Sequence, residues 1–152
     1  MKNFKKVDVC SLDNFVKHVF RAINVPNIEI EQAARVLISA DLRGIDSHGV
    51  ARLTGYVRLW EKKRVNTSPV VKIIHETLST ATVDGDEGLG LVVAPQAMRI
   101  AIAKAKVCGS GWVSVCNSNH FGIAAFHSLL AVEENMIGIS MTNASPLVAP
   151  TF

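Results

Sequence analysis

The chain has 152 residues, of which 49% are hydrophobic and 19% are charged, and its formal net charge is +3. This composition is typical of a globular α/β protein and excludes a disordered or fibrous one. The basic residues are scattered, without the basic and aromatic stripe that nucleic-acid binding requires. No run approaches the ~18 apolar residues that span a bilayer, and three cysteines without C-x-x-C spacing favour reduced thiols and no metal. We therefore expect a soluble, cytoplasmic protein without nucleic-acid or membrane partners.

Three helices are predicted in the first part of the chain. Apolar residues at helical spacing predict the first over residues 11–25, with Ser11 as its N-cap. The second is predicted over about 28–43, and Gly44 would end it. The third is expected to begin near Gly49 and to run to about residue 63, before Asn66-Thr67-Ser68-Pro69 breaks it.

Strands begin near residue 70, and helices and strands then alternate. The predicted order is strands over 70–77 and 80–86, a helix over 93–107, a strand over 111–117, a helix over 121–135 and a strand over 137–143. This order predicts the α/β class, with an N-terminal helical segment (1–66) followed by a mixed α/β layer. Residues 67–152 would be the first, incomplete part of a cofactor- and substrate-binding domain, because the sequence stops just past a buried strand.

The segment Asp46-Ser47-His48-Gly49, followed by Arg52 and Tyr56, is the first candidate site. Arg52 and Tyr56 are four residues apart and would share one helix face. A guanidinium binds a carboxylate through two hydrogen bonds, and an imidazole titrates near neutrality and can exchange a hydroxyl proton. These residue types suit oxidation of a 2-hydroxy acid, with Ser47 and Tyr56 assisting substrate binding. The alternative is that Asp46 or Ser47 only caps the helix and that His48 is a surface turn residue.

Polar residues also follow two predicted strands. Asn117-Ser118-Asn119-His120-Phe121-Gly122 lies between a strand and a helix, where α/β layers form their sites. The alternative is that Asn and Ser only supply turn and cap hydrogen bonds and that the backbone satisfies His120. Thr142, Asn143, Ala144 and Ser145 follow the last predicted strand and could line the same edge.

The glycines between residues 85 and 90 do not predict a dinucleotide site. Their spacing, G-x-x-G-x-G, is the reverse of the Rossmann fingerprint, and Asp86 and Glu87 would repel a pyrophosphate. We expect a tight turn between a strand and a helix.

Taken in order, these motifs resemble the malate/L-lactate dehydrogenase family of the non-Rossmann type, which includes ureidoglycolate dehydrogenase and diketogulonate reductase. The resemblance covers residues 11–152, the N-terminal part of the longer family members. It implies a homodimeric, cytoplasmic oxidoreductase that uses NAD or NADP. It also implies that His48 is the catalytic acid/base, that Arg52 holds the substrate carboxylate and that residues 142–145 contact cofactor or substrate. His120 aligns with a second active-site histidine to which some relatives assign the acid/base role, so both histidines stay candidates, with His48 preferred.

Three functions are compatible with this pattern. The first is transfer of a hydride between NAD(P) and a small 2-hydroxy or 2-oxo acid of the malate or lactate type. The second is a catalytically inactive fragment that serves only folding or dimerisation of such an enzyme. The third is a small anion-binding module that uses Arg52 without redox chemistry.

Overall fold

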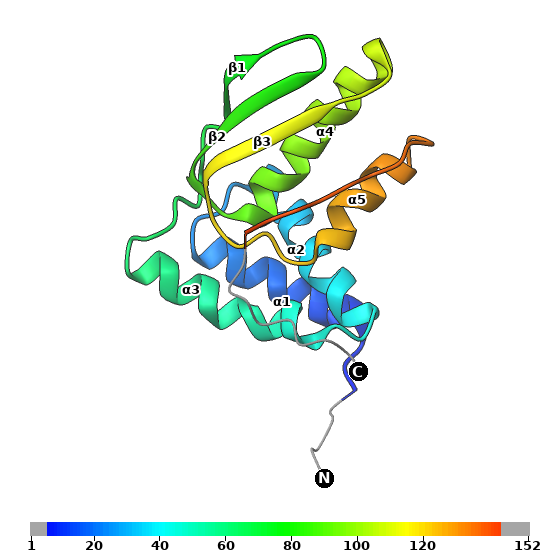
Figure 1. The fold of residues 1–152 in the computed structure, drawn as a ribbon. Helices are drawn as coiled ribbons and strands as arrows, with labels where there is room; N and C mark the ends of the chain where they lie inside the picture. Colours follow the sequence, from blue (N-terminus) through cyan, green and yellow to red (C-terminus); the bar gives the residue numbers. More distant parts are fainter. Residues whose placement is uncertain (1–5, 144–152) are drawn as a thin grey trace, which may run out of the picture.

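The computed structural model describes residues 6–143, which form a helical part and a sheet part (Figure 1). The helical part holds α1 (Val9–Ala22), α2 (Asn27–Leu42), the 3₁₀ turns η1 (Asp46–His48) and η2 (Val50–Arg52), and α3 (Leu53–Glu61). The sheet part holds β1 (Lys72–Glu76), β2 (Thr80–Gly88), α4 (Gly90–Cys108), β3 (Trp112–Ser118) and α5 (Ala124–Val132). The predicted α/β class, with helices first and a mixed sheet second, is confirmed.

The helical part is built on the packing of α1 against α2. Val16 and Phe20 of α1 are fully buried, as are Ala33 and Leu37 of α2, because apolar residues recur at helical spacing on the facing sides. Asp8, rather than the predicted Ser11, caps α1: its carboxylate accepts the Ser11 backbone N–H at 2.8 Å. The helix therefore begins two residues before the predicted start, and the N-cap carboxylate satisfies one of its free N–H groups.

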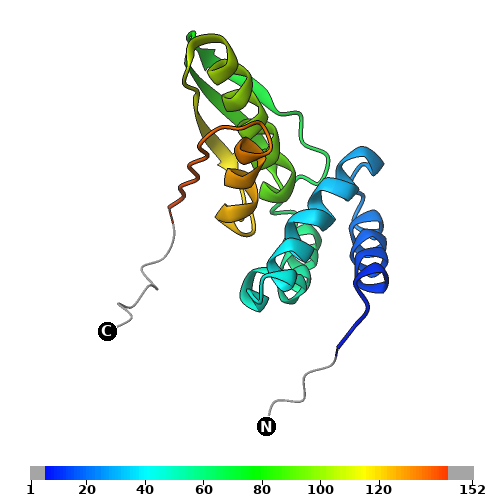
Figure 2. The same ribbon diagram turned by 90° about the vertical axis from the view of Figure 1, so that its right-hand side faces the viewer.

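The sheet has the order β1-β2-β3 and is mixed. β1 pairs antiparallel with β2, and β2 pairs parallel with β3. Parallel neighbours require a crossover, which α4 provides while covering one face of the sheet (Figure 2). This βαβ connection brings the end of β3 and the loop after it down to the helical part (Figure 1).

One hydrophobic cluster spans both sides of the predicted boundary at residue 66. It joins Phe20 and Leu37 of the helical part to Leu91 and Val92 of α4 and to Leu130 of α5. Whether the two parts are separate domains stays a prediction. Among residues 6–143, no helix is both long enough and apolar enough to cross a membrane.

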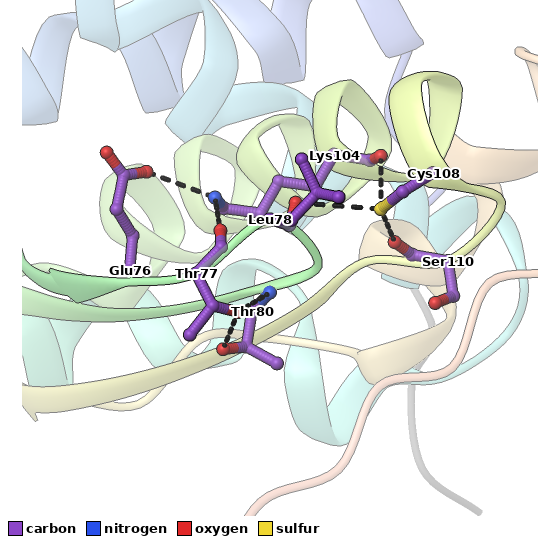
Figure 3. Close-up of polar contacts among 7 residues, drawn as sticks. All are labelled: Glu76, Thr77, Leu78, Thr80, Lys104, Cys108 and Ser110. Atoms are coloured by element: carbon purple, nitrogen blue, oxygen red, sulfur yellow. Dashed lines mark hydrogen bonds and ion pairs between the residues drawn. The ribbon is translucent and has the colours of Figure 1, made fainter.

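The turn between β1 and β2 is fixed to the C-terminal half of α4 (Figure 3). The Lys104 ammonium donates to Glu76 Oε2 at 3.0 Å and to the Thr77 carbonyl oxygen at 2.7 Å. The Cys108 thiol donates to the Leu78 carbonyl oxygen at 3.5 Å. These contacts hold the β1–β2 turn against α4. We therefore assign the side chains of Glu76, Lys104 and Cys108 a structural role.

Several predicted element boundaries were wrong. The third helix begins at Leu53 rather than near Gly49, because residues 46–52 form two 3₁₀ turns. The predicted turn over 84–90 is wrong in part: residues 84–88 belong to β2, with a register shift against β3, and α4 begins at Gly90 rather than near Val93.

The predicted strand over 137–143 is also wrong. This segment packs back on α5, where the Ser128 hydroxyl donates to the Ser140 hydroxyl at 3.0 Å and Gly138 lies against the Ser128 backbone. Ile137 and Met141 are exposed, and no strand of the described chain pairs with the segment. A strand needs such a partner for its backbone hydrogen bonds, whatever its side-chain pattern.

Candidate active site

The turn that carries His48 is held against the last turn of α2. The Asp41 carboxylate of α2 accepts the backbone N–H of Val50 at 2.9 Å. Gly49 is buried between them, and a β-carbon at this position would overlap the Asp41 carboxylate. The close approach of the Asp41 carboxylate therefore requires glycine at position 49.

Within this turn, Ser47 links the two residues expected to act on a substrate. The Ser47 hydroxyl and His48 Nδ1 are 2.9 Å apart, and Arg52 Nε donates to the Ser47 carbonyl oxygen at 2.6 Å. Arg52 is exposed and His48 is half-buried. Because Nε is occupied, the two terminal nitrogens of Arg52 are the ones left to bind an anion end-on.

The loop that carries His120 is pressed onto the start of α4. The Asn119 side-chain amide donates to the carbonyl oxygens of Glu87 at 2.8 Å and Gly88 at 3.2 Å. A β-carbon on Gly90 would lie 2.6 Å from the His120 carbonyl oxygen and would overlap that of Asn119. The glycine at the start of α4 thus lets the loop approach closely, which is a structural role for the segment over 85–90.

The crossover brings the two histidines together. The imidazole rings of His48 and His120 are stacked, with centroids 5.5 Å apart and planes 25° apart. The Tyr56 hydroxyl lies 2.7 Å from His120 Nδ1, although the two residues are 64 positions apart in the chain. The backbone N–H of Gly122 donates to the same nitrogen at 3.3 Å.

The surroundings shift the pKa values of His120 and Tyr56. Partial burial, followed by the positive charge of Arg52 and by His48, lowers the pKa of His120. Burial raises the pKa of Tyr56, which is 2% exposed, and the charge of Arg52 opposes part of this rise. The site therefore favours a neutral imidazole and a protonated phenol at neutral pH.

The structure thus brings five of the predicted site residues together. Those brought together are Ser47, His48, Arg52, Tyr56 and His120. Thr142 and Asn143 are exposed, whereas Ala144 and Ser145 lie outside the described residues.

Two positioning groups were missed in the sequence. Asp41 sits in the last turn of an amphipathic helix, where its carboxylate gives no signal beyond ordinary surface charge. The Gly122 N–H is a backbone group, which residue identity does not reveal. The loop over 117–122 does carry a usable signal, since Asn119 and Gly122 are residues that turns favour.

The site combines two imidazoles with a guanidinium and a phenol at the loop after a parallel strand, and these residue types suit proton transfer next to an anionic group. A family model described as malate/L-lactate dehydrogenase matches residues 7–152. The chain belongs to the malate/L-lactate dehydrogenase family, and the resemblance read from the motifs is confirmed.

Individual relatives agree with this assignment. A malate dehydrogenase of Pyrococcus abyssi is 49% identical over 150 residues, which are 99% of this chain and 41% of that protein. An L-sulfolactate dehydrogenase of Methanocaldococcus jannaschii is 44% identical, covering 87% of this chain and 38% of that protein. The solved malate dehydrogenase of Pyrococcus horikoshii is 48% identical with a TM-score of 0.93, over 99% of this chain and 43% of that one. The chain thus spans about two fifths of the length of these relatives.

Proposed function

We propose that this chain supplies the acid/base and carboxylate-binding groups of an oxidoreductase that transfers a hydride between NAD or NADP and a small 2-hydroxy or 2-oxo acid. The observation that carries the proposal is the stacked pair of His48 and His120, 5.5 Å apart, with Arg52 joined to the same turn. The names of the relatives, malate and L-sulfolactate dehydrogenase, support an acid of this class.

Arg52 is the proposed carboxylate-binding residue. Its terminal nitrogens form no hydrogen bond or ion pair within residues 6–143, and their fixed fork matches a carboxylate. The substrate carboxylate would therefore lie next to the Ser47–His48 turn, which places the neighbouring carbon-2 oxygen near the imidazole pair. Ser47 and Tyr56 would contribute to the same pocket.

The imidazole pair is the proposed proton-exchange group. In oxidation, the 2-hydroxyl proton passes to an imidazole as hydride leaves carbon 2, and in reduction the imidazolium returns it. A bound nicotinamide supplies or accepts the hydride. Because the rings of His48 and His120 are stacked with centroids 5.5 Å apart, either one is a candidate for this exchange.

The glycines at the junction of β2 and α4 do not fit a cofactor. The glycines at 88 and 90 do not form a phosphate cradle, because Pro69 and the backbone of Asn119 and His120 fill the space in front of them. Exposed Thr142 and Asn143 have polar groups able to contact a ligand. We keep residues 142–145 as proposed cofactor contacts, and the homodimer and cytoplasmic location as predictions of the resemblance.

The test is a turnover assay with oxaloacetate, pyruvate and related 2-oxo acids, following oxidation of NADH and NADPH by absorbance. We expect Arg52→Ala to raise KM roughly 10- to 150-fold, since hydrogen bonds to charged groups contribute about 1.5–3 kcal/mol. His48→Ala should instead lower kcat. Arg58→Ala is the matched control, because the Arg58 side chain is exposed on α3 and bonds to no described residue. Absence of turnover from the folded protein would favour the alternative of a non-catalytic folding or dimerisation part.

A further inference from the structure

The two imidazoles of the site have different hydrogen-bond partners. His120 Nδ1 faces two groups at once, the Tyr56 hydroxyl at 2.7 Å and the Gly122 backbone N–H at 3.3 Å. Within residues 6–143, His48 Nδ1 bonds only to the Ser47 hydroxyl, at 2.9 Å. This difference restricts one ring and leaves the other free, because the partners differ in what they can donate or accept.

The partners of His120 fix where its proton is. A backbone N–H can only donate, so Nδ1 must present its lone pair to Gly122 and cannot carry a hydrogen. With no hydrogen on Nδ1, the Tyr56 hydroxyl must be the donor of the 2.7 Å bond. The single proton of the neutral ring is then on Nε2.

A proton on Nδ1 of His120 instead of Nε2 would leave buried hydrogen-bond donors without acceptors. Tyr56 is 2% exposed, and His120 Nδ1 is the only hydrogen-bond partner that its hydroxyl has among residues 6–143. A proton on Nδ1 would turn the Tyr56 oxygen into an acceptor, leave its own O–H unpaired and displace the Gly122 N–H. Unpaired buried donors destabilise a structure, and the imidazolium form of His120 carries the same penalty.

His48 has no such restriction. A serine hydroxyl rotates and either donates to or accepts from Nδ1, so it follows both protonation states of the ring. Ser47 is exposed, so water can satisfy whichever of its groups is left over. The charged groups that face His120, Arg52 and His48, further oppose a second positive charge there.

We propose that Tyr56 and the Gly122 backbone N–H hold His120 as a neutral imidazole protonated on Nε2, a fixed hydrogen-bond donor to the substrate oxygen, which leaves His48 to exchange the proton. Tyr56 is then a positioning residue that acts through His120. In reduction, carbon 2 accepts the hydride of the nicotinamide while the carbonyl oxygen takes the proton of the His48 imidazolium. The Nε2–H of His120 stabilises the developing negative charge without leaving the ring. The kinetic part of this inference rests on the proposed function, whereas the proton position does not.

The decisive measurement is ¹⁵N NMR of the protein with labelled histidines, which distinguishes a protonated from an unprotonated ring nitrogen in each of the five. His127 is an internal reference, because its Nε2 bonds to the Phe121 carbonyl oxygen at 2.8 Å and must carry a proton. We expect His120 to show the same Nε2–H pattern at neutral pH. Tyr56→Phe should shift the ¹⁵N signal of His120 Nδ1, because that nitrogen loses the shorter of its two donors, while Ser47→Ala should change only the His48 signals. A proton on Nδ1 of His120 in the unsubstituted protein, or a His120 signal unaffected by Tyr56→Phe, overturns the proposal.

Kinetics give a second test with turnover conditions. We expect His48→Gln to lower kcat by about 10²- to 10⁴-fold and to remove the dependence of kcat/KM on pH near neutrality, since glutamine exchanges no proton. His120→Gln keeps an N–H donor and should lower kcat less, with the pH dependence intact. The reverse order of the two variants overturns the proposal. A protein without turnover but with the expected NMR pattern refutes the dehydrogenase and leaves the proton position established.

Discussion

The same substitution, glycine to alanine, should have opposite effects at two helical positions of this protein. Gly90 is the first residue of α4 and lies directly under the His120 loop, whereas Gly55 lies in α3 with no atom within 4 Å of where its β-carbon would be. Alanine is favoured over glycine within a helix by about 0.5–1 kcal/mol. Gly55→Ala should therefore stabilise the protein by up to that amount.

At Gly90 the steric cost exceeds this gain. The new β-carbon would lie 2.6 Å from the His120 carbonyl oxygen and nearer still to that of Asn119, and both are backbone atoms that cannot rotate away. Introducing a carbon into such a packed contact costs about 1–3 kcal/mol. Gly90→Ala should thus destabilise by about 1–2 kcal/mol net, and each kcal/mol corresponds to about 2–4 °C in Tm for a protein of this size.

Thermal unfolding followed by circular dichroism would test both variants, with Gly55→Ala as the matched control. The NMR signals of the His120 ring are a second readout, because Gly90→Ala should displace the loop that carries this residue. These signals should change in Gly90→Ala and stay unchanged in Gly55→Ala. If both variants raise Tm, the loop does not press on α4 as the structure shows, and the steric argument is refuted.

Three further substitutions test the contacts around the site and the sheet. Gly49→Ala should displace the Asp41 carboxylate from the Val50 N–H and lower the free energy of unfolding by about 1.5–3 kcal/mol in urea titrations; an unchanged midpoint would contradict this. Lys104→Met should cost less than about 1 kcal/mol, because its ion-pair partner is largely exposed, yet should speed hydrogen exchange in the β1–β2 turn; slow exchange there would show that Lys104 does not hold the turn. Burial lowers the pKa of His127 below the ~6.5 of an unfolded histidine, so the unfolded state binds more protons between those pKa values. The free energy of unfolding should therefore fall as pH drops below ~6.5 and be constant above it, and His127→Phe should reduce that fall in urea midpoints measured across pH; an equal fall in both proteins would contradict it.

The elements that the sequence predicted best are those whose signal is local. Helical spacing of apolar residues predicted α1 and α2, and the β-branched run from Trp112 predicted β3. The cap of α1 was assigned to Ser11 rather than Asp8, since both residue types cap helices and only the backbone conformation distinguishes them. The strand predicted over 137–143 failed because side-chain pattern carries no information about whether a pairing edge is available.

The site was predictable as a set of residues and not as a geometry. The residue types of His48 and Arg52 indicated their chemistry, but the stacking of His48 on His120 depends on the α4 crossover, which returns β3 toward the helical part. The bond between Tyr56 and His120 is long-range for the same reason. The position of the proton on His120 also depends on the backbone N–H of Gly122. Every residue except proline has such a group, so the sequence gives no signal for it.

The two imidazoles have hydrogen-bond partners that differ in burial, because Tyr56 is buried and Ser47 is exposed. His120 is joined to a buried phenol and to the backbone, so its hydrogen bonds change only if the fold changes. His48 is joined to an exposed hydroxyl, which reorients at little cost. Two imidazoles this close cannot both be charged without repulsion, and the charge of Arg52 increases the cost. A single proton on the pair therefore belongs on His48, whose serine partner accommodates both protonation states of the ring, whichever 2-oxo acid is bound.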